Sequence, residues 1–297
     1  MKPKRIAVMG ATGHIGTDLT RLLLENGYTV HAIGRDTGRL DGLKSKGAAT
    51  FQADFTDADR LAEAFAGTDL AFTMIPPNYG ADDFGRYQDQ CGEATVKALR
   101  ASGVKNVLDL SSIGAQLPKG TGPIAGLHRQ EGRLAALTGL NVVHLRPSYF
   151  MQNLMWQIPT IKNAGTLAGA LQPTLPIPMI HTKDIAEIAA TLVGHWEYKG
   201  SSVFECAGPE TVTLNDAAKT LGKALGRDLR YVQVAYEDEK KAMLGARMKP
   251  SIVDLMIEME KAFNEGVIAP TQEITKVHEG KIRLADFAKE FARAFKG

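Results

Sequence analysis

The stretch that decides the fold is Met9-Gly10-Ala11-Thr12-Gly13-His14-Ile15-Gly16, a G-x-x-G-x-x-G turn between an apolar run and an amphipathic segment. Gly10 permits a tight turn, Gly13 lets backbone N–H groups approach a pyrophosphate, and Gly16 lets a helix pack closely on a strand. The helix dipole would favour the same anion. The turn therefore predicts dinucleotide binding, and the alternative is a glycine-rich strand-to-helix turn without a ligand.

The sequence around the turn continues as alternating strands and helices. Helical spacing joins Ile15, Leu19, Leu22 and Leu23, and Asn26-Gly27 supplies a left-handed stop. Short apolar runs predict six strands in the first half: Arg5–Met9, Tyr28–Ile33, Ala49–Ala53, Leu70–Ile75, Asn106–Leu110 and Asn141–Leu145. Apolar strands that alternate with helices predict a parallel sheet covered on both faces, so we expect a doubly wound α/β fold of Rossmann type.

The pattern changes after Pro147, where we expect a smaller C-terminal α/β lobe. A helix at 182–195 and a strand at 202–206 are expected to return to the sheet. We therefore expect residues 1–149, completed by about 181–208, to form the dinucleotide-binding domain, and residues 150–180 and 209–297 to form the substrate lobe. The lobe's predicted elements are helices at Leu214–Leu225, Ser251–Phe263 and Leu284–Phe295 and a strand at Arg230–Val234.

Composition excludes several classes of function. The chain carries 35 basic and 33 acidic side chains, a formal charge of +2, so we expect no nucleic-acid partner. Cys91 and Cys206 lie far apart without a Cys/His cluster, which disfavours disulfides and a metal site. The apolar run after Met1-Lys2-Pro3-Lys4-Arg5 is too short for export or a membrane span, so we expect a cytoplasmic protein with no membrane partner.

The end of the second predicted strand bears on which nucleotide is bound. Arg35 offers a planar fork of donors that suits the 2′-phosphate of NADP(H), and Gly34 leaves no carboxylate there to repel it. NADP(H) is therefore favoured, with NAD(H) as the alternative if Asp36 binds the ribose. Asp36 also precedes a helical pattern, where an N-cap explains it equally.

Further motifs in matching order make the chain resemble the NmrA-like group of atypical short-chain dehydrogenases/reductases, and within it the NAD(P)H-dependent quinone and triphenylmethane reductases. These motifs are Asp54-Phe55, Ile75-Pro76-Pro77, Ser111-Ser112, Arg146-Pro147 to Asn153, and Asp184-Ile185-Ala186. The resemblance implies that Asp54 and Phe55 flank the adenine and that the Ile75–Pro77 loop covers the adenosine side. It also implies that Ser111 and the Pro147–Asn153 segment approach the nicotinamide.

Each of these residues also has a structural explanation. Asp54 would cap the helix that begins near Asp57, the Pro76-Pro77 pair would end a strand, and Asp184 is expected to be a helix N-cap rather than a site residue.

The catalytic residue stays unassigned, because the Tyr-x-x-x-Lys pair of the wider superfamily is missing between the fifth and sixth strands. Tyr236 and Lys240 have that spacing, but they lie far along the chain on what we expect to be a solvated helix face. His128 is either a proton donor or a packed side chain. Aromatic and Met side chains past the sixth strand suit a flat substrate or a helix core: Tyr149, Phe150, Met151, Met155 and Trp156.

These features predict an NADPH-preferring oxidoreductase that transfers hydride to a small electrophilic organic substrate such as a quinone. Protonation would then come from water, and the protein would mainly position the reactants. The resemblance leaves a second hypothesis, a redox sensor of the NmrA type that binds NADP(H) without turnover and reports to a protein partner. The missing Tyr/Lys pair supports this alternative.

Overall fold

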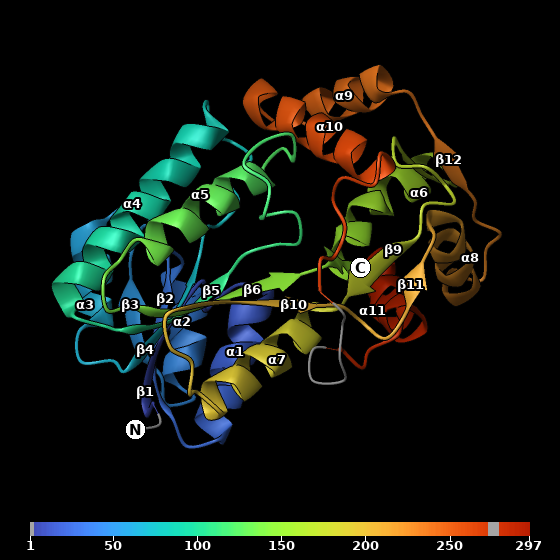
Figure 1. Cartoon of the computed structure of the whole chain (residues 1–297). Helices are drawn as coiled ribbons and strands as arrows, with labels where there is room; N and C mark the ends of the chain where they lie inside the picture. Colours follow the sequence, from blue (N-terminus) through green and yellow to red (C-terminus); the bar gives the residue numbers. More distant parts are fainter. Residues whose placement is uncertain (1–2, 273–278) are drawn as a thin grey trace.

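A seven-stranded parallel sheet forms the centre of the molecule (Figure 1). The structure is a computed structural model that describes residues 3–272 and 279–297. The strand order is β10-β6-β5-β4-β1-β2-β3, and every pair in it is parallel. The strands are β1 Arg5–Met9, β2 Thr29–Gly34, β3 Ala49–Gln52, β4 Leu70–Met74, β5 Asn106–Leu110, β6 Asn141–Pro147 and β10 Ser201–Cys206.

Helices cover both faces of this sheet, with α4 and α5 above it and α1 and α7 below it in Figure 1. Successive residues of β1 show why: Ile6 and Val8 pack with α1 and α7, whereas Ala7 and Met9 pack with α3 and α4. The helices are α1 His14–Glu25, α2 Thr37–Lys44, α3 Ala58–Phe65, α4 Phe84–Ser102, α5 Ile124–Ala135 and α7 Thr182–Gly194. The predicted doubly wound α/β fold is confirmed.

A second lobe has its own apolar core, which includes Met151, Leu221 and Phe291. It holds a three-stranded sheet, β11-β9-β7, and a two-stranded pair, β12-β8. Its strands are β7 Tyr149–Phe150, β8 Leu167–Gly169, β9 Ile177–Ile180, β11 Thr211–Val212 and β12 Tyr231–Gln233. Its helices are the 3₁₀ helix η1 Met151–Gln157, α6 Ile158–Ala164, α8 Leu214–Leu225, α9 Tyr236–Gly245, α10 Pro250–Asn264 and α11 Leu284–Lys296.

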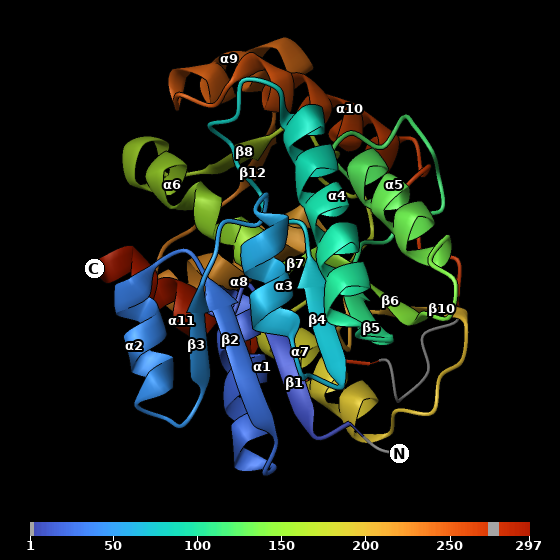
Figure 2. The ribbon, with the colours of Figure 1, turned by 90° about the vertical axis from the view of Figure 1, so that its left-hand side faces the viewer.

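The chain connects the two lobes more than once. After η1, α6 and β9, helix α7 packs on α1, and β10 then pairs with β6 at the sheet edge. Helix α10 lies over the start of α4 (Figure 2), where the Ser251 hydroxyl accepts a hydrogen bond from the Phe84 N–H at 3.3 Å. The boundaries at 149, 181 and 208 stay a prediction.

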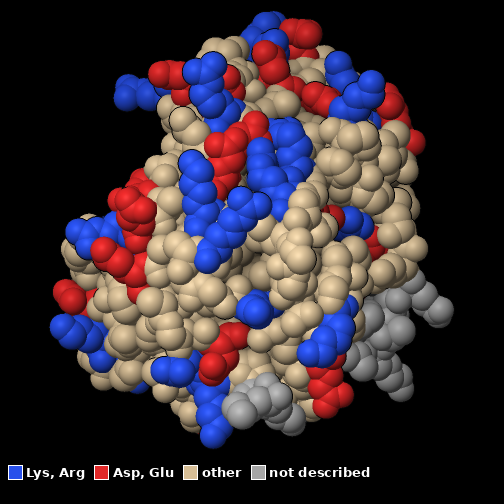
Figure 3. All heavy atoms as spheres, turned by 60° about the vertical axis from the view of Figure 1, so that its left-hand side comes forward, with Lys and Arg blue, Asp and Glu red and all other residues tan. Residues whose placement is uncertain are grey.

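The surface is mixed in charge. On the face seen in Figure 3, acidic and basic side chains lie interspersed, in keeping with the formal charge of +2. No helix in the described part of the chain is long and apolar enough to cross a membrane.

Candidate functional site

The glycine turn lies where the sheet reverses its direction of growth. β1 has β2 on one side and β4 on the other, so the carboxyl end of β1 is a topological switch point, the place where doubly wound sheets bind ligands. Gly10 has a φ of +68°, and its carbonyl accepts a hydrogen bond from the Gly13 N–H at 2.9 Å. A Cβ on Gly16 would overlap the same carbonyl oxygen. Close packing of α1 on the turn therefore requires a glycine at position 16.

The turn leaves the beginning of α1 open to an anion. Gly13 is the N-cap and offers no side chain to cap the helix, and the first turn of α1 contains no acidic residue. The unpaired N–H groups and the helix dipole therefore face outward without competition from the protein. These features fit a pyrophosphate, which would replace the missing cap.

Arg35 follows β2 beside a polar surface pocket of about 360 Å³, which also includes Gln52 and Asp54. Its guanidinium makes no ion pair with any other described residue, so it remains available to a phosphate. Arg39, which none of the sequence motifs indicated, extends from α2 toward the glycine turn and donates to the Thr12 carbonyl at 3.3 Å. The signal that could have found Arg39 is its position one helical turn after Arg35.

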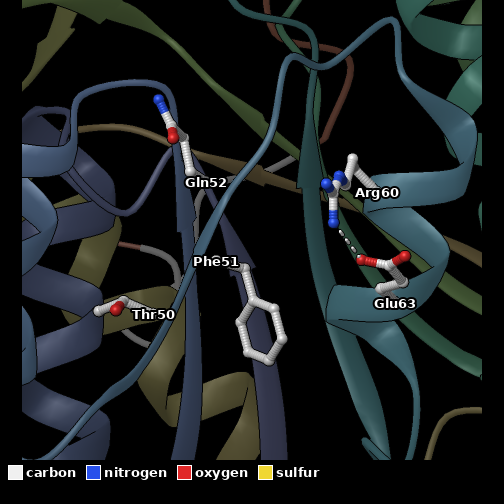
Figure 4. Close-up of a pocket in the computed structure, with 5 residues that line it drawn as sticks. All are labelled: Thr50, Phe51, Gln52, Arg60 and Glu63. Carbon is white, nitrogen blue, oxygen red and sulfur yellow. Dashed lines mark hydrogen bonds and ion pairs between the residues drawn. The ribbon is translucent and has the colours of Figure 1, made fainter.

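A second pocket adjoins the first between β3 and α3 (Figure 4). It shares Gln52 and Arg60 with the pocket beside Arg35, and Arg60 is ion-paired to Glu63 at 2.8 Å. The side chain of Phe51 lies between the strand and the helix in Figure 4. Arg60 is therefore held in an ion pair, whereas Arg35 forms none with the described residues.

Asp36 and Asp54 perform different local tasks. The Asp36 carboxylate accepts the Arg39 N–H at 3.0 Å and caps α2, so the N-cap explanation holds for this residue. Asp54 does not cap α3, because Asp57 does; that alternative is wrong. Asp54 instead accepts the Thr56 N–H and hydroxyl. Burial raises the pKa of Asp54, but the Thr56 hydrogen bonds and the Arg35 charge outweigh it and lower that pKa.

Phe55 and Ser111 lie at the predicted strand ends but turn their side chains inward. Phe55 is 3% exposed and packs in the core under α3 and α4, so its side chain is not open to a ligand in this structure. The Ser111 hydroxyl donates to Glu131 at 2.6 Å. Arg146 donates to the same Glu131 carboxylate through Nε and one terminal guanidinium nitrogen, at 2.8 and 2.6 Å. Through Glu131, this buried network connects the carboxyl ends of β5 and β6. It therefore holds the position of Pro147, the residue after Arg146.

Two loops approach each other above the sheet. The loop after β4 contains Ile75, Pro76 and Pro77 and continues to Tyr79, whose ring meets Trp156 of η1 edge-on at 5.6 Å. Trp156 is 64% exposed, so this aromatic pair leaves one apolar face open. Asn153 is exposed on the same 3₁₀ helix. Met151 is fully buried, which confirms the core interpretation for that residue.

The polar residues of α5 are engaged in packing. His128 Nδ1 lies 2.8 Å from the Ala115 carbonyl oxygen, so this nitrogen carries the hydrogen. Arg129 and Arg133 both bind Asp89 of α4, at 2.8 and 2.5 Å. These contacts give all three residues a structural role, and proton donation by His128 stays a prediction.

The helix that carries Tyr236 is not a solvated face along its whole length, contrary to expectation. The Tyr236 hydroxyl accepts a hydrogen bond from Asn264, and Glu239 turns inward to accept the Ala170 N–H. Helix α9 packs on α10 along this side. The charged residues of α9 gave no sign of this packing in the sequence.

Asp184 is not the N-cap of α7, because the His181 side chain fills that role. Asp184 is instead buried and accepts the Ile282 N–H at 3.0 Å. Its carboxylate therefore ties α7 to the segment that precedes α11, and the expectation of a cap is wrong.

The fold and the glycine turn define a doubly wound protein with a dinucleotide-binding turn at its switch point. The chain belongs to the NmrA-like family, whose model matches residues 2–288. The resemblance that the motifs indicate is therefore confirmed. No group of three or more potential metal ligands occurs within residues 3–272 and 279–297.

Three known proteins show the range of this similarity. The chain is 29% identical to the NAD(P)H azoreductase of Xenophilus azovorans over 98% of its own length and 99% of the relative's. Its fold matches the Escherichia coli quinone oxidoreductase QOR2 in complex with NADPH, with a TM-score of 0.80, 22% identity, and coverage of 96% and 99% of the two chains. It also matches the Citrobacter sp. triphenylmethane reductase in complex with NADP(H), with a TM-score of 0.80, 20% identity, and coverage of 97% and 99%.

Proposed function

We propose that this protein is an NAD(P)H-dependent reductase that prefers NADPH and transfers hydride to a small electrophilic organic acceptor, a quinone or an azo compound. The observation that carries the proposal is the open N-terminus of α1 behind the glycine turn, with the unpaired Arg35 guanidinium beside it. The near full-length similarity to an azoreductase supports the acceptor class. We place the activity in the cytoplasm, since both cysteines are free and buried.

The chain's own residues would hold the nucleotide by its anionic groups. The unpaired N–H groups at the start of α1, from His14 onward, would bind the pyrophosphate, and Arg35, supported by Arg39, would bind the 2′-phosphate. Asp54, Phe55 and the Ile75–Pro77 loop would border the adenosine. Ser111 and the Pro147–Asn153 segment would border the nicotinamide, held in place by the Arg146–Glu131 network.

The bound nucleotide would supply a hydride, and the protein would position the acceptor against it. Tyr79 and Trp156 would offer a flat apolar wall to an aromatic acceptor. Such a wall binds substrate and transition state alike, so its main effect is on KM.

A panel assay tests the proposal. Purified protein is mixed with NADPH or NADH and with a quinone, an azo dye or a triphenylmethane dye, and loss of the reduced-nicotinamide absorbance is followed. We expect turnover with at least one acceptor, and we expect Gly13→Val to abolish nucleotide binding in calorimetry while the protein stays folded. Tight NADPH binding without turnover of any acceptor would instead support the sensor. Unchanged NADPH affinity in Gly13→Val would refute the site assignment.

A further inference from the structure

The loop between β4 and α4, residues 75–83, is bound to the start of α10 in the second lobe (Figure 2). The Ser251 hydroxyl donates to the Ala81 carbonyl at 3.2 Å and accepts the Phe84 N–H at 3.3 Å. A serine hydroxyl has one hydrogen to donate and lone pairs to accept, so these bonds use it in both directions. The Phe84 N–H belongs to the first turn of α4, where helix N–H groups lack helical partners. Ser251 therefore holds both the loop and the helix that follows it.

Lys249 adds two contacts to the same loop. Its N–H donates to the Tyr79 carbonyl at 3.3 Å, and its ammonium lies 2.7 Å from an Asp82 carboxylate oxygen. The Asp82 side chain is 90% exposed and that of Lys249 is 46% exposed, and an ion pair so open to water contributes little. The hydrogen bonds of the Ser251 hydroxyl and the Lys249 backbone are therefore the contacts that hold the loop. We call these contacts the interlobe contact.

The turn before α10 has an unusual backbone. Arg247 has a φ of +65°, and no other residue except glycine has a positive φ in the described part of the chain. A side chain in this left-handed conformation is unfavourable, and it persists where surrounding contacts determine the path of the chain. The Arg247 N–H donates to the Leu244 carbonyl at 2.9 Å and closes the end of α9. The left-handed residue then directs the chain so that Lys249 and Ser251 reach the loop.

Helix α10 and the 3₁₀ helix η1 share one apolar core. Phe263 of α10 packs in the same buried cluster as Met151 and Leu154 of η1. Tyr149, which lies just before η1, meets the Phe263 ring edge-on at 6.1 Å. The second lobe therefore carries Trp156 of η1 and Ser251 of α10 on one packed body.

The aromatic wall proposed for the acceptor is built from both lobes. Tyr79 comes from the loop of the sheet lobe and Trp156 from η1, and their rings meet edge-on at 5.6 Å. Trp156 is 64% exposed, so this single ring contact does not offset the entropy lost when a loop without helix or strand is ordered. The loop needs a further attachment close to Tyr79, and the interlobe contact provides it.

We propose that Ser251 is a positioning residue for the acceptor site: by holding the loop, it keeps Tyr79 against Trp156 and so sets a preference for acceptors with more than one aromatic ring. The inference rests on the proposed reductase function. An azo dye with an aromatic ring on each side of its N=N bond can contact both rings of the wall. A single-ring quinone covers only part of it. Loss of the Ser251 hydroxyl should therefore weaken the binding of the azo dye more than that of the quinone.

Steady-state kinetics at saturating NADPH test this preference. A contact between two aromatic rings contributes roughly two- to tenfold in affinity. Ser251→Ala should raise KM about three- to tenfold for a two-ring azo dye and less than about twofold for 1,4-benzoquinone. Both kcat values should stay within about twofold of the wild type, because a wall binds substrate and transition state alike. Ser251→Thr, which keeps the hydroxyl, should restore the wild-type KM.

A double variant shows whether Ser251 acts through Tyr79. Tyr79→Ala should itself raise KM for the azo dye, and the addition of Ser251→Ala should raise it no further. Ser102→Ala is the matched control, because Ser102 is also half-buried and its hydroxyl also donates to a carbonyl, that of Leu99, but at the opposite end of α4. This control should behave as the wild type with both acceptors.

Tryptophan fluorescence tests the same contact in the nucleotide-free protein without any acceptor. The chain has two tryptophans, and Trp196 is only 6% exposed, so acrylamide reaches mainly Trp156. Release of Tyr79 uncovers one side of Trp156. Ser251→Ala should therefore raise the acrylamide quenching constant toward that of Tyr79→Ala, and the difference should disappear when Trp156→Phe is introduced into both proteins.

Different results separate this inference from the proposed function. A wild type that turns over no acceptor would overturn the reductase proposal and the acceptor site with it. Wild-type quenching in Ser251→Ala would refute the positioning role, whatever the activity. With an active wild type, an equal rise in KM for both acceptors or additive effects in the double variant would contradict it as well. If Ser251→Ala does not fold, Ser251→Cys, similar in shape but only a weak donor, takes its place in each comparison.

Discussion

Replacement of Glu260 by Gln should stabilise the folded protein, and the gain should increase with pH. The folded pKa of Glu260 is raised to about 9 from an ordinary 4.5 by burial and by Glu239. Below pH 4.5 both folded and unfolded chains hold the proton, so the group has no effect there. Between these values only the folded chain holds it, and stability falls by about 1.4 kcal/mol per pH unit.

This slope gives the size of the effect. At pH 7, which is 2.5 units above 4.5, Glu260 lowers the free energy of unfolding by about 3 kcal/mol relative to a side chain that does not titrate. Gln has nearly the shape of the protonated acid and does not titrate, so it should remove this dependence on pH. For a chain of this size, 1 kcal/mol corresponds to roughly 2 to 4 °C in Tm, so the variant should melt at least about 5 °C higher at pH 7.

The assay is thermal and urea unfolding of the wild type, Glu260→Gln and Glu237→Gln at one-unit intervals from pH 5 to pH 8. Glu237 is exposed, so its variant should stay within about 0.5 kcal/mol of the wild type at every pH. The reasoning fails if the gain from Glu260→Gln stays constant or shrinks as pH rises, because the wild type would then hold an ionised Glu260 at neutral pH.

Four further substitutions test the rest of the site. Arg35→Ala should weaken NADPH binding about ten- to a hundredfold in calorimetry and NADH binding much less; equal losses would assign Arg35 to the fold. Gly16→Ala drives a Cβ into the Gly10 carbonyl oxygen, so its Tm should fall by several degrees even without nucleotide. His128→Ala should lower kcat less than about tenfold, and a thousandfold loss would make His128 the acid. Trp156→Ala should raise KM more than it lowers kcat, and the reverse would contradict a stacking role.

The parts of the fold that sequence predicts well are those whose signal is local. β1 and the glycine turn are contiguous, and each crossover helix carries its own apolar face, so the parallel sheet follows from patterns a few residues long. The short strands β7, β8, β9 and β11 give no such signal. They contain two to four residues each, too few for a periodicity to show, and they exist because the lobe folds around them.

The site is less predictable because its geometry depends on residues distant in sequence. Arg146 and Ser111 meet on Glu131, and Tyr79 meets Trp156, only after the strands have been placed. The inward turn of the Phe55 and Ser111 side chains has the same origin. A residue at the carboxyl end of a strand is correctly located by topology, but the direction of its side chain is decided by the neighbours that fold against it.

Glu260 is different, because a local signal for it exists in the sequence. An apolar stripe with helical spacing runs along α10, and an acid interrupts it at one position that the helix itself does not require. A buried carboxyl pair lowers stability at neutral pH, and a well-packed apolar side chain would remove that penalty. Local rules of packing are broken in this way mainly where a protein uses the group, and strongly shifted pKa values gather at functional sites. An acid inside an apolar helical stripe is therefore a residue whose amino-acid pattern alone predicts a buried carboxyl group with a raised pKa.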